Sequence, residues 1–357
     1  MKYQEIKSSP RVGREFQHLE DLVFVEGSTG AQFAIDLLES LANKNISVKW
    51  DGNPTIYWGR NSTGNFVLVN KNAWGRTVCT SADMLEEFIM TTGRGEPWRQ
   101  AFAESLTGIW SYLESATPRW FRGYLYGDLL FYPARPSVVT NESIEFTPNK
   151  VTYAVNSQSA LGQRMFSAKV GIAVHKSFSS FGSTDGNSVE FAKTFESADV
   201  ALISQTRVNT SVSVGKARMQ DVKTILENHG QAIDQFLTPV AGLSDMKNII
   251  YTYVNQTSKA KNLSLLGETF ADWLAQSKVS SNKQAKILAL AESNPTALPA
   301  IFGLVKEIMH IKNSIIEQLD TNNHQVRATT LNETGGEGYI MLDEKIKLVP
   351  RHRWVPD

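Results

Sequence analysis

The sequence has 357 residues but only one cysteine, Cys79, and no excess of either charge. A single cysteine excludes an intramolecular disulfide and any zinc site built from several cysteines, and it fits a reducing compartment. With 36 basic and 36 acidic residues the formal net charge is zero. No global positive field therefore favours nucleic acid, so any contact with a polyanion has to come from a local patch.

Long apolar runs are also absent from the sequence. None approaches the length of a membrane span, and the first residues, Met1–Glu5, lack the pattern of a signal peptide. We therefore expect a cytoplasmic protein with no membrane partner. A Walker-type phosphate loop, zinc-ligand spacing and a convincing Ser/His/Asp arrangement are missing as well. The length suits a sizeable core and two lobes.

The most informative segment is Lys49-Trp50-Asp51-Gly52, which follows the apolar run Ile46–Val48. A lysine between a strand and a tight Asp-Gly turn can act as a covalent nucleophile, provided that its surroundings favour the neutral amine. The turn would aim the side chain into a pocket. Taken alone, the tetrad fits an ordinary strand-to-turn junction equally well.

Three further segments follow in order. Gly127-Asp128 lies inside the strand-like run Tyr124–Phe131, Glu337–Met341 reads as Glu-Gly and three apolar residues, and Lys345–Val349 begins Lys-x-Lys. The three residues between the last two segments suit a hairpin. Together the four segments resemble the motifs of the covalent lysine nucleotidyltransferase superfamily, which contains ATP-dependent RNA and DNA ligases and mRNA capping enzymes.

A narrower resemblance covers the N-terminal half. Residues 18–24, 48–56, 146–153 and 170–175 look like a family of tailed-phage proteins that is regarded as nucleic-acid ligases on these same motifs. This resemblance implies a phage-encoded enzyme acting in the host cytoplasm.

The pattern along the chain gives the expected organisation. We predict an amphipathic helix over about 30–43, a hairpin of 56–59 with 66–69, and a helix over about 97–115. The resemblance implies an α+β fold whose core is an antiparallel-sheet nucleotidyltransferase, an ATP-grasp-like ligase. Residues 1–215 and 321–357 would form this core, and a helical domain, 216–320, would be inserted before the last two motif strands.

The inserted helices favour a lid or substrate clamp, and a structural buttress is the alternative. A C-terminal OB-fold is not expected, because few residues follow Lys347.

The resemblance also assigns roles to residues. Lys49 would attack the α-phosphate of ATP and form lysyl-AMP, after Asp51 and Gly52 turn the chain, and Lys345 and Lys347 would share one strand face and orient the phosphates. Asp128 and Glu337 would hold Mg²⁺ (or Mn²⁺) or bind the ribose. Tyr153 is the candidate for the aromatic residue that stacks on the base, and His175 and Phe178 remain as alternatives.

The sequence departs from the ligase pattern at two positions. Pro54 stands where many DNA ligases have an arginine, so ribose or phosphate contacts would come from Arg60, Lys71 and Arg76, although these also fit a solvated hairpin. Asp128 replaces the usual glutamate and shortens the carboxylate arm. Nearby Trp74 looks exposed.

The leading expectation is an ATP-dependent polynucleotide ligase acting on nucleic-acid ends, RNA ahead of nicked DNA. A nucleotidyltransferase with another acceptor, such as a protein or an RNA cap, and a non-catalytic binding module are the alternatives, and GTP in place of ATP stays open. Two other segments remain ambiguous. His18–Asp21 fits a polar cluster or a helix cap, and Arg351–Trp354 fits a nucleic-acid contact or a tail docked on the sheet.

Overall fold

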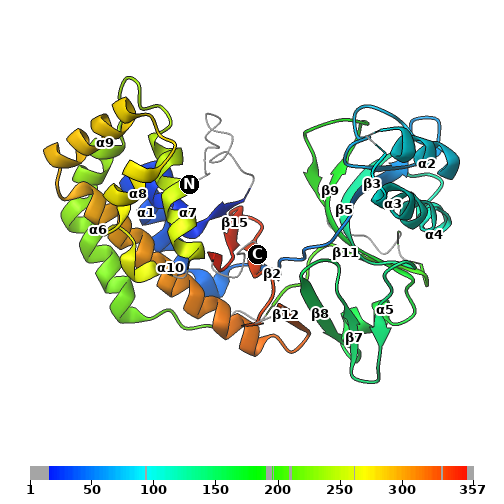
Figure 1. The fold of residues 1–357 in the computed structure, drawn as a ribbon. Helices are drawn as coiled ribbons and strands as arrows, with labels where there is room; N and C mark the ends of the chain where they lie inside the picture. The colour runs from blue at the N-terminus through cyan, green and yellow to red at the C-terminus, as the bar shows by residue number, and fades with distance from the viewer. Residues whose placement is uncertain are drawn as a thin grey trace. The chain divides into compact units, whose positions relative to one another are not determined.

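The computed structural model describes residues 16–92, 95–189, 195, 197–208, 211–260, 262–330 and 333–351. The fold is mixed α+β, as predicted, with three open sheets (Figure 1). Two of the sheets are mixed, because β1 pairs with β15, and β11 with β9, in parallel. The third sheet, which contains β12 and β8, is antiparallel. The chain divides into two compact units, which are described separately.

Unit 1 comprises residues 1–48, 207–322 and 337–357, and unit 2 comprises 49–206 and 323–336. This division differs from the predicted one. The helical segment 216–320 is not a unit of its own, because its helices pack on the N-terminal helix α1 (Leu22–Glu39). The physical reason is that α1 is almost wholly apolar on the side that these helices cover. A deletion of 216–320 would therefore expose the core of unit 1.

Unit 1 contains helices and a small sheet of order β1-β15-β14-β2. Its strands are β1 (Gln17–His18), β2 (Ile46–Val48), β14 (Tyr339–Met341) and β15 (Ile346–Leu348). Besides α1, the helical segments of unit 1 are η1 (Leu19–Asp21), η2 (Leu41–Asn43), α6 (Lys216–Leu237), α7 (Met246–Lys259), η4 (Leu263–Leu265), α8 (Phe270–Gln276), α9 (Ser281–Ser293) and α10 (Ala297–Asn322). The hairpin predicted for the last two motifs is confirmed, since β14 and β15 pair antiparallel.

In unit 2, one sheet has the order β10-β9-β5-β3-β4, with β11 on β9. Its strands are β3 (Thr55–Arg60), β4 (Phe66–Asn70), β5 (Gly123–Phe131), β9 (Val170–Phe178), β10 (Asn187–Ser188) and β11 (Val200–Ile203). Alternation places Ile56 and Trp58 on the face that packs against three helices (Figure 1). These are α2 (Ala82–Thr91), α3 (Trp98–Thr107) and α4 (Trp110–Ala116). The hairpin predicted for β3 and β4 is confirmed.

The second sheet of unit 2 has the order β13-β12-β8-β7-β6. Its strands are β6 (Val138–Val139), β7 (Ser143–Phe146), β8 (Val151–Asn156), β12 (Val326–Thr330) and β13 (Glu333–Thr334), and the short helix α5 (Ala160–Met165) follows β8. Residues 151, 153 and 155 are buried, whereas 152 and 154 are half-buried. The sheet therefore turns one regular face into the core of the unit.

Helix α1 contains a break at Gly27, where φ is +63°. Side chains from neighbouring helices form hydrogen bonds with the backbone on both sides of the break. The carboxylate of Asp234 accepts from the Ser28 amide at 2.7 Å, and Lys247 Nζ donates to the Val25 carbonyl at 2.6 Å. A Cβ at position 27 would lie 2.3 Å from Asp234 Oδ1, so only glycine fits.

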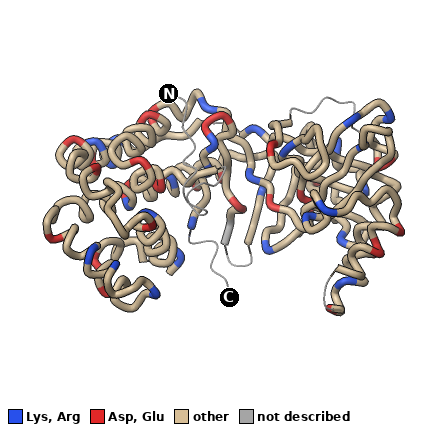
Figure 2. Tube along the Cα trace, turned by 90° about the horizontal axis from the view of Figure 1, so that it is seen from above, with Lys and Arg blue, Asp and Glu red and all other residues tan. Residues whose placement is uncertain are grey.

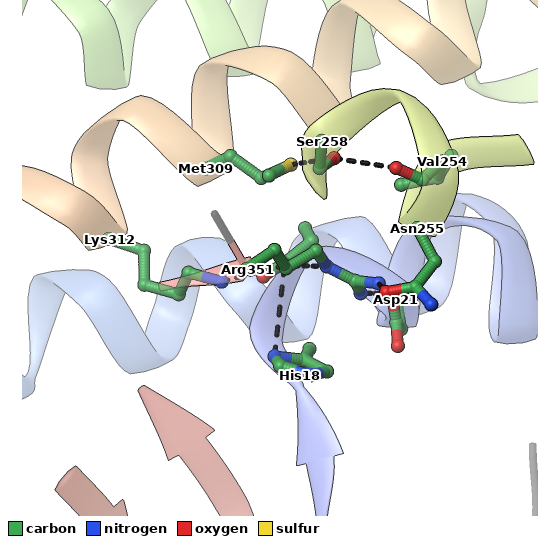
Figure 3. A network of polar contacts seen from close by, with 9 residues as sticks. His18, Asp21, Val254, Asn255, Ser258, Met309, Lys312 and Arg351 are labelled. Atoms are coloured by element: carbon green, nitrogen blue, oxygen red, sulfur yellow. Dashed lines mark hydrogen bonds and ion pairs between the residues drawn. The ribbon is translucent and has the colours of Figure 1, made fainter. Parts of the chain in front are cut away.

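Unit 1 also contains a buried charge cluster, defined here as Glu20, Asp21, Lys312 and Arg351 (Figure 3). Lys312 Nζ and Arg351 Nε lie 2.6 and 2.7 Å from Glu20 Oε1, and Arg351 also bonds to Asp21. Burial raises the pKa of Glu20, but the two cations outweigh it and hold the pKa at about 2. Burial lowers the pKa of Lys312, against the attraction of Glu20. Two anions and two cations thus compensate one another.

The cluster bears on both ambiguous segments. Glu20 and Asp21 belong to it and neither His18 nor Asp21 makes a side-chain cap hydrogen bond, so residues 18–21 contribute to a polar cluster rather than a helix cap. Arg351 is 3% exposed and docks inside unit 1, so its own guanidinium does not face solvent where a nucleic-acid backbone could reach it. Residues 352–354 of the basic tail lie outside the described residues.

Within the described parts of the chain, no single helix is long and apolar enough to cross a membrane. One pair of helices, α9 and α10, passes that test together but is bent by 93°.

We expect Lys312→Met to lower the free energy of unfolding by about 3–5 kcal/mol, because it leaves two buried carboxylates facing one cation. Urea denaturation followed by circular dichroism measures this. The matched control is Lys223→Met, which breaks an exposed bridge to Glu39 and should cost at most about 1 kcal/mol. The double variant Lys312→Met/Glu20→Leu keeps the Arg351–Asp21 pair and should recover much of the loss. Equal, small losses in both single variants would contradict this account of the cluster.

Candidate active site

The loop that follows Lys49 is anchored in unit 2 by its neighbours. Trp50 is buried, its Nε1 donates to Thr206 Oγ1 at 3.1 Å, and its ring lies 4.8 Å from that of Tyr153. The Asp51 amide donates to the Tyr153 hydroxyl at 3.0 Å, and Asn149 donates to the Asp51 carboxylate. Lys49 itself is half-buried at the start of this anchored loop.

Gly52 brings the loop into contact with β5. A Cβ on this glycine would lie 2.5 Å from the Leu129 carbonyl oxygen and 2.8 Å from Asp128 Cβ, so no other residue fits without movement. Two backbone hydrogen bonds of 2.9 Å, from the Asn53 amide to the Leu129 carbonyl and from the Leu129 amide to the Pro54 carbonyl, hold the approach. The Lys49 tetrad and the Gly127-Asp128 motif therefore meet within unit 2.

Asp128 is held by a partner on each side. Thr55 lies directly opposite it on β3 and donates from Oγ1 to Asp128 Oδ1 at 2.6 Å. His175 Nε2 lies 3.0 Å from Asp128 Oδ2. The side chain of Asp128 is 16% exposed and that of His175 is 35% exposed. The carboxylate thus has a fixed orientation and stays partly exposed.

An aromatic surface continues from Asp128 along the same sheet face. Tyr57 lies opposite Tyr126, and Trp74 stacks on Tyr57 with ring centroids 4.1 Å apart. Burial, together with the charge of Asp128, raises the pKa of Tyr57. Trp74 Nε1 donates to the Ser183 carbonyl at 3.1 Å, so the indole expected to be exposed is half-buried in this surface.

The three candidates for base stacking differ in how accessible their rings are. Tyr153 is fully buried and its hydroxyl holds Asp51, so the prediction that it stacks on the base is wrong. Phe178 is 6% exposed among other aromatic rings. His175 remains accessible beside Tyr126, with ring centroids 5.6 Å apart.

The three residues predicted to donate to phosphate also differ in exposure. Arg60 is buried, and its guanidinium donates to the backbone carbonyls of Gly64, Glu114, Thr117 and Pro118. It therefore closes the C-terminal end of α4, and the prediction that it contacts nucleotide is wrong. Lys71 and Arg76 are exposed on the turn that carries Trp74, and their contact with phosphate stays a prediction.

The remaining motif residues belong to unit 1. Glu337 is buried, and Lys347 lies in β15 opposite Ile340. Lys345 has a φ of +55° and lies before β15, in the turn of residues 342–345. The prediction that the two lysines alternate on one strand face is therefore wrong, because the left-handed turn interrupts the extended backbone.

A metal site was predicted at Asp128 and Glu337. Among the described residues, no group of three or more His, Cys, Asp or Glu side chains is arranged to hold a metal ion. Mg²⁺ nevertheless binds in many proteins through one or two carboxylates plus substrate phosphates. Asp128, oriented and partly exposed, fits that role.

Sequence reasoning did not single out Thr55, Asn149 or Trp50. Each acts through contacts to residues far along the chain, so no local pattern marks its role. The strand register would have found Thr55, which lies opposite Asp128.

The fold defines a mixed α+β protein with an acid–histidine pair and a lysine-bearing loop in one unit. The chain belongs to the family described as "Family of unknown function (DUF6267)", whose model matches residues 14–355. No match was found among curated proteins or among solved structures. The family match spans both units, and its description gives no activity.

We expect Gly52→Ala to destabilise the protein by about 1–3 kcal/mol, because the added methyl group overlaps backbone of β5 that cannot yield easily. The denaturation midpoint in urea measures this. Gly215→Ala is the control, since nothing lies within 4 Å of a Cβ there, and it should change stability by less than about 1 kcal/mol. An unaltered midpoint for Gly52→Ala would show that the loop does not pack on β5 as described.

Proposed function

We propose that the protein is an ATP-dependent polynucleotide ligase with a nucleotidyltransferase core, and that RNA ends are its preferred substrate. The observation that carries the proposal is the contact of Gly52 with β5, which brings the Lys49 loop beside Asp128. A nucleophile and a metal-binding carboxylate are the two groups that nucleotidyl transfer to a lysine needs most. The order of the four motif segments supports the same assignment.

The first step forms a phosphoramidate. The neutral Lys49 amine attacks the α-phosphorus of ATP, the nitrogen–phosphorus bond forms as the bond to the bridging oxygen breaks, pyrophosphate leaves, and the nitrogen loses its proton to solvent. In the second step a 5′-phosphate oxygen attacks the same phosphorus, the phosphorus–nitrogen bond breaks, and the lysine nitrogen takes up a proton from solvent. A 3′-hydroxyl then attacks the activated 5′-phosphate and AMP leaves.

The residues of unit 2 would divide the work. Asp128 would hold Mg²⁺, which neutralises charge on the phosphates when bound. Thr55 and His175 would fix the orientation of that carboxylate, since each bonds one of its oxygens. The roles of Glu337, Lys345 and Lys347 rest on the resemblance alone.

We expect Lys49 to gain one AMP when the protein is incubated with ATP and magnesium. Intact-protein mass spectrometry should detect the adduct, and Lys49→Ala should abolish it because no other amine occupies the position. Lys44→Ala is the matched control, since Lys44 lies on the same segment but pairs with Glu344 at 2.8 Å. An adduct that survives Lys49→Ala sinks the assignment.

The same preparation distinguishes the alternatives. Transfer of AMP to a 5′-phosphorylated RNA, followed by sealing, supports the ligase. An adduct that no RNA or nicked DNA discharges indicates another acceptor. A non-catalytic module would form no adduct with ATP or GTP.

We expect Asp128→Asn to slow adduct formation by about 10²-fold or more, because the amide keeps the shape but loses the charge that binds the metal. The rate is measured by quenched-flow or manual sampling at saturating ATP over a series of magnesium concentrations. Asp185→Asn, in an exposed loop of the same unit, is the control. If Asp128→Asn forms the adduct at the wild-type rate, Asp128 has no role in this step.

A further inference from the structure

The loop between α4 and β5 presents an exposed tryptophan between two arginines. Trp120 is 66% exposed, the highest value among the large apolar side chains that the structure describes. Arg119 and Arg122 are exposed as well. A single exposed apolar residue is common on protein surfaces, but an indole flanked by two guanidinium groups is a more specific combination.

The backbone that carries this indole is held in place. The Phe121 amide donates to the Pro118 carbonyl at 3.1 Å, and Arg122 Nη1 donates to the Arg119 carbonyl at 2.8 Å. Beneath them, buried Arg60 bonds the carbonyls on which the loop begins, those of Thr117 and Pro118. Trp120 is thus presented by an ordered turn, so little conformational entropy is lost when a ligand stacks on it.

The rings around Trp120 leave most of the indole uncovered. Phe195 is buried and meets Phe121 edge-on at a centroid distance of 4.9 Å, and it meets the indole at 6.3 Å. The apolar surface on offer is therefore one aromatic plate rather than a contiguous patch. Protein-docking sites have an apolar core with a polar rim, which this loop lacks.

The charged side chains of the loop itself, Arg119 and Arg122, are both positive. No acid occurs between Glu114 and Asp128 in the sequence. The neighbouring hairpin tip, Asn61–Asn65, is uncharged, and it lies close to Arg122, whose Nη2 would be 2.9 Å from a Cβ on Gly64. This surface stands out in a chain whose cations and anions are interspersed along both units (Figure 2).

The helical segment of unit 1 makes a poorer nucleic-acid surface than expected. Many of its cations are already engaged within the unit, as in the pairs Arg218–Glu307, Lys223–Glu39, Lys283–Asp245 and Lys312–Glu20. Releasing them for phosphate would break these pairs. In the loop of residues 119–122, Arg119 and Trp120 could contact nucleic acid without breaking any of these pairs.

We propose that residues 119–122 bind single-stranded nucleic acid, with a base stacked on Trp120 and phosphates on Arg119 and Arg122. Base–indole stacking accepts any base, and guanidinium groups suit phosphate oxygens. The inference rests on the proposed function for its choice of nucleic acid as the partner. Binding is independent of adenylylation, however, so the two are tested separately.

The experiment measures the anisotropy of a fluorescein-labelled, 5′-phosphorylated single-stranded RNA against the full-length protein without ATP, over a series of salt concentrations. Trp120→Ala should weaken binding by roughly ten- to a hundredfold, and Trp120→Phe should retain most of it. The double variant Arg119→Ala/Arg122→Ala should lower the slope of log affinity against log salt by about 1.4.

The control is Trp98→Ala. Trp98 is also exposed, at 54%, and also has an arginine beside it, but Arg99 bonds to Glu96 and to the Ile89 carbonyl. It should leave RNA affinity unchanged. Equal effects of Trp98→Ala and Trp120→Ala, or affinity unaltered in all the loop variants, would overturn the inference. The inference would also be overturned if Trp120→Ala changed only self-association, measured by sedimentation. The loop would then be a contact between protein molecules.

Lysyl-AMP formation is measured on the same preparations. If the wild-type protein forms no lysyl-AMP but its RNA binding depends on Trp120, the result counts against the proposed function alone. A normal adduct with RNA binding that ignores the loop would count against the inference alone.

Discussion

The candidate site depends on the close approach of residues 51–54 to the end of β5. This approach is made by backbone, through hydrogen bonds between Asn53, Pro54 and Leu129, and it is possible because Gly52 has no side chain. The surrounding anchors, Trp50 on Thr206 and Tyr153 on Asp51, are neutral donors or neutral rings. Salt screens interactions between exposed charges but has little effect on such contacts. The loop that carries Lys49 is therefore positioned by packing and by backbone hydrogen bonds.

Unit 1 follows the opposite principle, since its centre holds buried charges. Removing four ionic groups from water is costly, and the cost is offset only when each finds an opposite partner. The partners come from distant parts of the chain, Glu20 near one end, Lys312 on α10 and Arg351 near the other end. These contacts are highly non-local, so the unit cannot complete its core until late segments are in place. This also explains why the helical segment 216–320, although continuous in sequence, does not form a separate domain.

The sequence predicted those features that depend on local pattern. Alternation and turn residues located the hairpins of β3 with β4 and of β14 with β15, and the order of motifs brought Asp128 into consideration. Residue roles were harder, because the same residue type serves a surface or a core. Arg60 reads as a hairpin cation, yet its guanidinium donates to backbone carbonyls at and just after the end of α4 and to that of Gly64. For Tyr153 the signal was present, since Val151, Tyr153 and Val155 repeat with the period of a buried strand face. Lys345 was misplaced because a left-handed turn delays the start of β15 to Ile346.

Balanced charge has a consequence for how such a protein meets a polyanion. A chain with equal numbers of acids and bases exerts little long-range attraction, so encounter is not strongly steered and contact energy has to come from short-range groups. Stacking on an indole is short-ranged, accepts any base and is little affected by salt, whereas two arginines give only a modest dependence on ionic strength. The buried position of Arg60 links these properties to the fold, because the same guanidinium that is withdrawn from solvent orders the turn on which Trp120 is exposed. One cation is thus used for structure, and the neighbouring arginines remain at the surface.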